Sequence, residues 1–280
     1  MNANRFGSSP SKRLSALLKP EAVEAWRIPL PGALPIRMDP AGAREAVLLL
    51  HGFMGYPGEL EPLANGLAGA GYAVSVPRLP GHGTGRRDFL LTGAEDWARR
   101  AYDAYLELRA EYEIVHVGGH SMGGLLASSI AVSFGLPRLI LLAPVFELSI
   151  RYIWLTPLIA PFKAVIAGKR MPSAFDSANP VRNALYAEYW ADVMVGQAAE
   201  LMRLRRLCRN NVRYCRSRIL VIAGENDSSV PVGVIDYLRR AAPLAASFDS
   251  RVIAGAPHVF PFDEHAAETV SLVLEWMASP

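Results

Sequence analysis

The sequence EIVHVGGHSMGGLLASSIAVSFG, residues 113–135, decides the fold class. It begins with a β-rich apolar run, passes through a glycine turn around Ser121 and continues as an apolar stretch of helical length. Residues 114–137 lack Asp, Glu, Lys and Arg and are long enough to cross a bilayer. Five glycines, four serines and two histidines interrupt them. The stretch therefore predicts a strand, a tight turn and a buried helix rather than a membrane span.

Apolar runs of strand length alternate with longer helical patterns over most of the chain. The candidate strands are residues 34–38, 45–50, 72–76, 113–118, 138–143, 218–224 and 250–255, and the candidate helices lie near 58–70, 94–111, 122–134, 232–242 and 263–278. Several strands are continuously apolar, which is typical of strands covered on both faces in a parallel sheet. The alternation predicts an α/β fold with a mostly parallel, doubly wound sheet.

Two segments break this alternation. Residues 1–30 contain no apolar stretch as long as the ~7–15 residues of a signal peptide, so we expect an N-terminal arm rather than a secretion signal. Residues from about 145 to 216 hold Pro-interrupted apolar and helical stretches between two core strands. An insertion of this size predicts a helical lid or cap. Residues 31–280, cap included, are predicted to form one domain.

The predicted cap carries two conspicuous sets of side chains. Residues 203–218 hold seven arginines and no acid. A solvated helix face is the favoured interpretation, and attraction of an anionic lipid or acidic substrate is the alternative. An apolar set either lines an acyl pocket or packs the lid onto the core; it comprises Tyr152, Ile153, Trp154, Leu155, Leu158, Ile159 and Phe162.

Composition narrows the class of protein further. With 280 residues, 51% of them hydrophobic, the chain is neither disordered nor fibrous. A net charge of +3 is too small to require a nucleic-acid partner. The two cysteines, Cys208 and Cys215, are expected to lie two turns apart on one helix, too far apart for a disulfide. We therefore expect a reducing, cytoplasmic location.

The glycine turn matches G-x-S-x-G at Gly119–Gly123 and lies between a candidate strand and a candidate helix. A nucleophilic serine on such a turn has a strained backbone, and the residues two before and two after it must be small. The helix that begins at Met122 directs its positive end toward the site. The motif therefore predicts Ser121 as a nucleophile, and a turn used only for packing is the alternative.

A nucleophilic serine needs a base, and the base needs an orienting acid. In this architecture the acid and then the histidine follow the serine along the chain. Asp227 and His258 each lie just beyond a candidate strand, where ligands bind in open α/β sheets. His265 is the rival base, but it falls inside the last candidate helix. Glu147, four residues beyond the strand that ends at 143, is the rival acid.

Attack on a carbonyl builds negative charge on oxygen, which backbone N–H groups stabilise. One donor is expected from Met122 and the other from Phe53, in the loop after the strand 45–50. His51 in that loop is expected to brace it. A metal held by His51 and His82 is conceivable, but the sequence has no H-E-x-x-H motif or Cys/His cluster, so no metal is predicted.

Taken together, these motifs resemble the α/β-hydrolase superfamily, and most closely its carboxylesterases and monoacylglycerol lipases. The matching pieces are VLLLHGFMG (47–55), GYAVSVPRLPGHGT (71–84), DW (96–97), VGGHSMGG (117–124), AGENDSSVP (223–231) and PH (257–258). The resemblance implies an α/β-hydrolase fold and the roles already assigned to Ser121, Asp227, His258, Phe53 and Met122. It implies no cofactor.

The expected function is that of a serine hydrolase that cleaves short to medium acyl esters or monoacylglycerols through an acyl-enzyme. Thioester cleavage, carbon–carbon hydrolysis and acyl transfer on the same three residues are the alternatives, because one fold hosts many reactions. A further alternative is a binding protein without catalytic activity. The expected partner is a small acyl ester, with at most peripheral contact to lipid.

Overall fold

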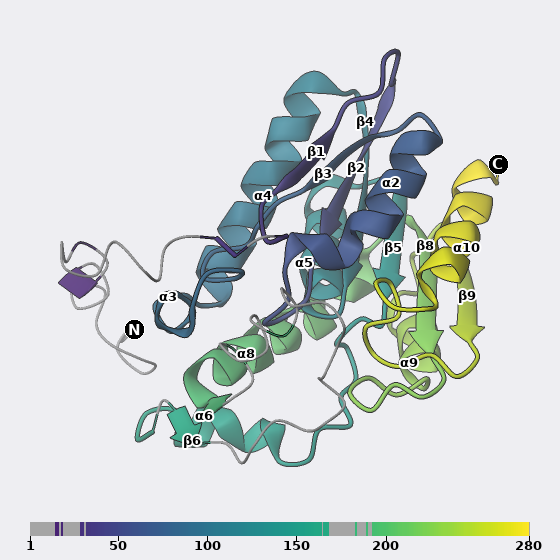
Figure 1. Cartoon of the computed structure of the whole chain (residues 1–280). Coiled ribbons are helices and arrows are strands. Elements are labelled where there is room, and N and C mark those ends of the chain that lie inside the picture. Colours follow the sequence, from purple (N-terminus) through teal and green to yellow (C-terminus); the bar gives the residue numbers. More distant parts are fainter. Residues whose placement is uncertain are drawn as a thin grey trace.

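A computed structural model describes residues 15, 16, 18, 29–30, 32–163, 165–167, 183, 189 and 192–279 (Figure 1). Its main sheet has seven strands in the order β1-β3-β2-β4-β5-β8-β9. The strands are β1 (Ile36–Met38), β2 (Glu45–Leu50), β3 (Ala73–Val76), β4 (Ile114–His120), β5 (Arg138–Leu142), β8 (Arg218–Gly224) and β9 (Ser247–Ile253). Within this sheet β1 pairs antiparallel with β3 and the other pairs are parallel. The predicted mostly parallel sheet is confirmed.

Helices cover both faces of the sheet, as a doubly wound fold requires. On one face α2 (Glu61–Gly69) packs against α10 (Ala266–Ala278), and on the other α4 (Ala94–Glu111) packs against α5 (Met122–Phe134) (Figure 1). The shorter helical elements are η2 (Pro57–Leu60), α3 (Arg86–Phe89) and α9 (Val234–Ala241).

The segment predicted to be a cap lies beyond the carboxyl ends of β5 and β8 (Figure 1). Its described elements are η3 (Ile153–Leu155), α6 (Thr156–Ile159), β6 (Val165–Ala167), β7 (Asp192–Met194), α8 (Val195–Asn211) and η5 (Val212–Tyr214). β6 and β7 form a two-stranded antiparallel ribbon, and α8 packs against α4, α5 and α6. The predicted arm lies almost entirely outside the described residues. The division into arm, domain and cap stays a prediction.

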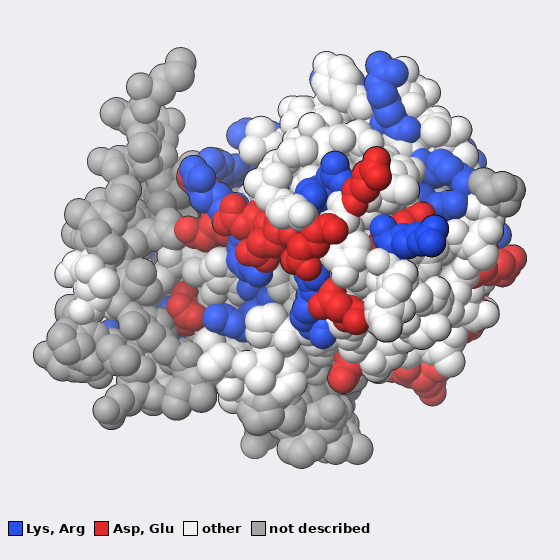
Figure 2. Space-filling model, turned by 90° about the horizontal axis from the view of Figure 1, so that it is seen from above, with Lys and Arg blue, Asp and Glu red and all other residues white. Residues whose placement is uncertain are grey.

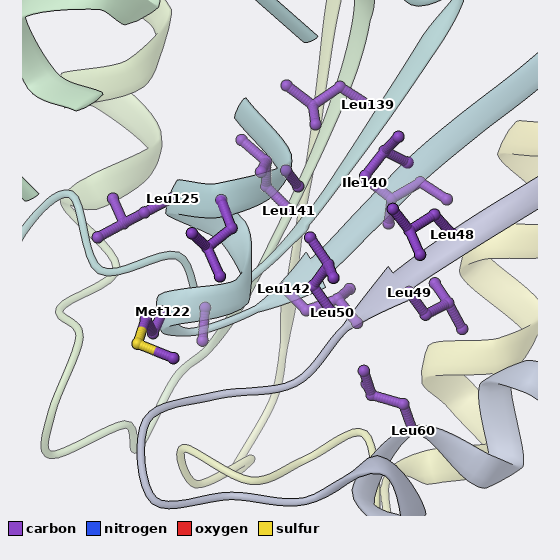
Figure 3. Packing of buried hydrophobic residues seen from close by; sticks show 14 of the residues in the cluster. Leu48, Leu49, Leu50, Leu60, Met122, Leu125, Leu139, Ile140, Leu141 and Leu142 are labelled. Carbon is purple, nitrogen blue, oxygen red and sulfur yellow. The ribbon is translucent and has the colours of Figure 1, made fainter. Parts of the chain in front are cut away.

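The buried core is built mainly from the central strands and α5. Figure 3 shows side chains of β2 and β5 together with those of α5 and η2, including Leu48, Leu49, Leu50, Leu60, Met122, Leu125, Leu139, Ile140, Leu141 and Leu142. These side chains are at most 1% exposed. Strands apolar on both faces can be buried only between two helical layers, which explains the continuous apolar runs in the sequence.

The charge-free run at 114–137 forms β4, a turn and the buried helix α5, as predicted. No described helix is long and apolar enough to cross a membrane. Two other expectations were wrong. Cys208 lies in α8, but Cys215 lies beyond it, after η5, because the helix ends at Asn211; both thiols are free and buried. His265 immediately precedes α10 rather than lying inside it.

Charged side chains of both signs lie close together on the face seen in Figure 2. Some charged side chains of the described residues form ion pairs: Arg37 pairs with Glu111 at 2.7 Å, and Arg100 pairs with Glu107 at 3.0 Å. Exposed pairs of this type add little to stability. They do reduce the local field, because opposite charges lie within a few ångströms of one another.

The strand order places a topological switch point between β2 and β4. The chain passes from β2 to β3 on one side and then crosses back to β4 on the other side of β2. Ligands of open α/β sheets bind outside the carboxyl ends of the strands at such a point. The loop after β2 and the turn after β4 both lie there, with Leu50 paired to Gly119 at the ends of the two strands.

Candidate active site

Ser121 occupies a sharp turn between β4 and α5. Its backbone has φ 56° and ψ −116°, a positive φ that side-chain-bearing residues rarely adopt. A Cβ built on Gly119 would lie 2.2 Å from the carbonyl carbon of Gly123, and one built on Gly123 would lie 1.9 Å from the carbonyl oxygen of Leu50. Both positions therefore require glycine, and the turn holds the Ser121 side chain above the end of β4.

Three side chains from distant parts of the chain form one line of hydrogen bonds. Ser121 Oγ lies 2.9 Å from His258 Nε2, and His258 Nδ1 lies 2.7 Å from Asp227 Oδ2. An ionised carboxylate can only accept hydrogen bonds, so His258 Nδ1–H donates to Asp227 and Nε2 is left to accept from the serine hydroxyl. This is the arrangement in which a histidine can take a proton from serine.

Asp227 is held in place and kept ionised by its surroundings. Its Oδ1 accepts the backbone N–H groups of Ser229 at 2.7 Å and Val230 at 2.8 Å, and its side chain is 1% exposed. Burial alone raises the pKa of Asp227, but the hydrogen bond and charge of His258 and the two backbone N–H groups lower it, and the resulting pKa lies below its ordinary value. The carboxylate is thus negative beside His258.

Neither rival residue reaches this line of hydrogen bonds. Glu147 Oε1 pairs with Arg209 at 2.6 Å, while the described partner of His258 Nδ1 is Asp227. His265 Nδ1 lies 3.2 Å from Asp263, its neighbour in the loop before α10. The structure therefore brings together the three residues that the sequence favoured and leaves both alternatives elsewhere.

The loop after β2 lies against the serine. A Cβ built on Gly52 would lie 3.2 Å from the Cβ of Ser121, so only a residue without a side chain fits easily at this distance. The ring of Phe53 packs edge-on against Phe89 and Trp97, with centroid distances of 5.3 and 5.8 Å, which anchors the Phe53 side chain in the loop.

The two predicted oxyanion donors are backbone N–H groups on either side of the site. Neither the N–H of Phe53 nor that of Met122 donates to a turn or loop carbonyl of the described chain. Met122 is the first residue of α5, where N–H groups have no acceptor inside the helix. Both groups are therefore available to a developing oxyanion.

His51 braces the Phe53 loop, as its sequence position suggested. Its Nδ1–H donates to the carbonyl of Gly52 at 3.0 Å, and its Nε2 accepts the N–H of Leu79 at 3.1 Å. Burial lowers the pKa of His51 to about 4, so the ring is neutral near pH 7. Among the described residues, no group of three or more His, Cys, Asp or Glu side chains could hold a metal ion.

His120 is a member of the site that the sequence analysis missed. Its Nε2–H donates to the backbone carbonyl of His258 at 2.8 Å, and the two ring centroids lie 5.0 Å apart. Burial, with a smaller contribution from His258, lowers the pKa of His120 to about 3, so the ring stays neutral. His120 thereby ties the loop that carries the base to the turn that carries Ser121. The feature of the sequence that could have identified His120 is its position directly before the serine in the G-x-S-x-G motif.

We expect His120→Leu to lower kcat about tenfold, because losing one hydrogen bond of about 1.4 kcal/mol lets the His258 loop shift. His120→Gln should retain most of the activity, because its side-chain N–H₂ can replace Nε2–H. Steady-state kinetics on a chromogenic ester should show the loss in kcat with KM nearly constant. Equal losses in both variants would argue against this positioning role.

With the geometry established, comparison with known proteins identifies the family. The model of the Alpha/beta hydrolase family matches residues 47–272, which is most of the chain. The chain belongs to the α/β-hydrolase family, and the fold predicted from the sequence is confirmed.

Particular relatives are lipases and esterases. A thermostable monoacylglycerol lipase of Bacillus sp. (strain H-257) is 44% identical over 85 residues, which cover 30% of this chain and 34% of the relative. A carboxylesterase of Bacillus subtilis (strain 168) is 39% identical over 85 residues, covering 30% and 35%. The matched stretch thus spans about a third of the length of these curated relatives.

Two solved structures share the fold over nearly the whole chain. One belongs to a study of the metagenome-derived lipolytic enzymes LipS and LipT and superposes with a TM-score of 0.77 at 22% identity, covering 89% of this chain and 99% of the other. The other is the monoacylglycerol lipase of Paleococcus ferrophilus, with a TM-score of 0.69 at 18% identity, covering 87% and 97%. At sequence identities of 22% and 18%, the similarity to these two structures shows a shared fold and nothing beyond it.

Proposed function

We propose that this protein is a serine hydrolase of carboxylic esters, acting on short to medium acyl esters or monoacylglycerols through an acyl-enzyme. The observation that carries the proposal is the line of hydrogen bonds from Ser121 Oγ through His258 to Asp227, with distances of 2.9 and 2.7 Å. The names of the two Bacillus relatives support ester hydrolysis as the reaction. The cytoplasmic location stays a prediction.

The first half-reaction forms the acyl-enzyme. His258 Nε2 takes the proton from Ser121 Oγ as the oxygen attacks the acyl carbonyl carbon, and the carbonyl π electrons move onto oxygen. The N–H groups of Phe53 and Met122 stabilise this oxyanion, while the ionised Asp227 stabilises the imidazolium. When the oxyanion collapses, the bond to the alcohol oxygen breaks and His258 gives that oxygen its proton.

The second half-reaction uses the same groups on water. His258 takes a proton from a water molecule that attacks the acyl carbon, and the same two N–H groups stabilise the second oxyanion. Its collapse releases the carboxylic acid and returns the proton to Ser121 Oγ. The chain's own residues supply every proton transfer in the cycle.

A series of p-nitrophenyl esters from C2 to C12, alongside monoacylglycerols, thioesters and diketones, tests the proposal. We expect a burst of p-nitrophenol equal to the enzyme concentration, which indicates an acyl-enzyme. Turnover should be highest on oxygen esters of short to medium chain or on monoacylglycerols. Faster turnover of thioesters or diketones than of any oxygen ester would contradict the proposal.

A further inference from the structure

A groove of about 370 Å³ lies along α8. It is lined by Pro157 of α6 and by Ala199 and Met202 of α8 on its apolar side. The two helices pack against each other, and positions three, four and seven apart on α8 fall on one helix face. The same face carries arginines, so apolar surface and positive charge meet in one groove.

The groove has more positive than negative charge. Four arginines line it, namely Arg203, Arg205, Arg206 and Arg209. Glu200 pairs with Arg203 at 3.3 Å, and Glu147 pairs with Arg209 at 2.6 Å and lies 3.9 Å from Arg205. Four guanidinium groups thus share two carboxylates, and Arg206 forms no ion pair with any described residue.

Arg205 is the most enclosed of these arginines. Its side chain is 18% exposed, and its Nε is buried without a hydrogen-bond partner in the described part of the chain. A buried donor without an acceptor is costly, because it has lost its hydrogen bonds to water. Arg205 lines the groove, and guanidinium groups bind carboxylate and phosphate oxygens well.

Two exposed apolar side chains lie on the elements that pack beside the groove. Trp154 in η3 is 61% exposed and Leu158 in α6 is 65% exposed, and both elements pack against α8. We propose that this groove binds one free anionic amphiphile with a single alkyl chain. Its carboxylate or phosphate would lie on Arg205 and Arg206 and its chain would run past Met202 toward Leu158. The acid released by ester hydrolysis belongs to this class, but the proposal does not depend on that reaction.

Calorimetry with dodecanoate below its critical micelle concentration tests the proposal. We expect saturable binding of one molecule per chain, about tenfold weaker in Arg206→Gln and at least as much weaker in Arg205→Gln. Arg206 is exposed, so its variant should fold even if Arg205→Gln does not. Arg213→Gln is the matched control: it makes the same charge change at an arginine that does not line the groove, although its Nε–H donates to the backbone carbonyl of the lining residue Asn210, and it should bind as the wild type does.

Three further ligands separate the sources of binding. Dodecyl phosphate should bind like dodecanoate. Dodecanol has the alkyl chain without the anionic group, and inorganic phosphate has the anionic group without the chain, so both should bind much more weakly. Equal weakening by Arg206→Gln and Arg213→Gln would mean general charge attraction and would overturn the proposal. So would binding of dodecanol as tight as that of dodecanoate, or binding seen only with anionic vesicles.

Location is tested by fluorescence. A bromine-labelled dodecanoate should quench Trp154, and the quenched component should disappear in Trp154→Phe while affinity remains. If the quenching persists in Trp154→Phe, the amphiphile lies elsewhere and the proposal is overturned. The same follows if phosphonylation of Ser121 abolishes dodecanoate binding while Arg206→Gln leaves it unchanged.

Discussion

Ser121→Ala is expected to lower kcat for ester hydrolysis by about 10⁶-fold, the loss that follows removal of the serine from a comparable triad. The loss is this large because His258 and Asp227 act only through the serine oxygen, so removing it disables all three residues together. Ester hydrolysis followed at high enzyme concentration measures the residual rate. The N–H groups of Phe53 and Met122 would remain and account for what is left.

Ser128→Ala is the matched control for this change. It removes a serine hydroxyl from α5, the helix that begins directly after Ser121, but Ser128 Oγ donates to the carbonyl of Leu125 and lies outside the line of hydrogen bonds. We expect unchanged kcat for Ser128→Ala. A fluorophosphonate should label the wild type and Ser128→Ala but not Ser121→Ala. Near-normal turnover by Ser121→Ala with a native circular dichroism spectrum would contradict the assignment of the nucleophile.

The centre of the fold could be predicted because its signals are local. The strand before Ser121, the turn and the buried helix after it follow one another within residues 113–135, and the glycines at 119 and 123 are demanded by contacts within that turn and with the adjacent end of β2. Asp227 and His258 could be placed because parallel strands end at the same edge of a sheet. Their meeting at 2.7 Å follows from the pairing of β8 with β9.

The features that sequence reasoning missed depend on contacts between distant segments. The bond from His120 to the carbonyl of His258 joins residues 138 positions apart, and no local pattern encodes it. The pairing of Arg209 with Glu147 likewise appears only when α8 packs beside the loop after β5. Cys215 was misplaced for a different reason, since the ends of helices are poorly defined by periodicity and α8 ends at Asn211.

Asp227→Asn is expected to lower kcat about 10⁴-fold while the fold is kept, as the same change does in another serine hydrolase. The backbone N–H groups of Ser229 and Val230 donate to Oδ1. They would hold the amide oxygen of Asn in that place and turn its N–H₂ toward His258 Nδ1. His258 would then accept at Nδ1 and carry its proton on Nε2, which faces Ser121, so it could not take the serine proton.

Glu147→Gln separates this prediction from the rival assignment of the acid. It makes the same carboxylate-to-amide change in the other candidate, whose described partners are Arg205 and Arg209 rather than His258. We expect its kcat on a p-nitrophenyl ester to match that of the wild type. Because both variants keep side-chain shape, a difference of several orders of magnitude between them can come only from the partner of His258 Nδ1. The opposite result, with Asp227→Asn active and Glu147→Gln inactive, would make Glu147 the acid.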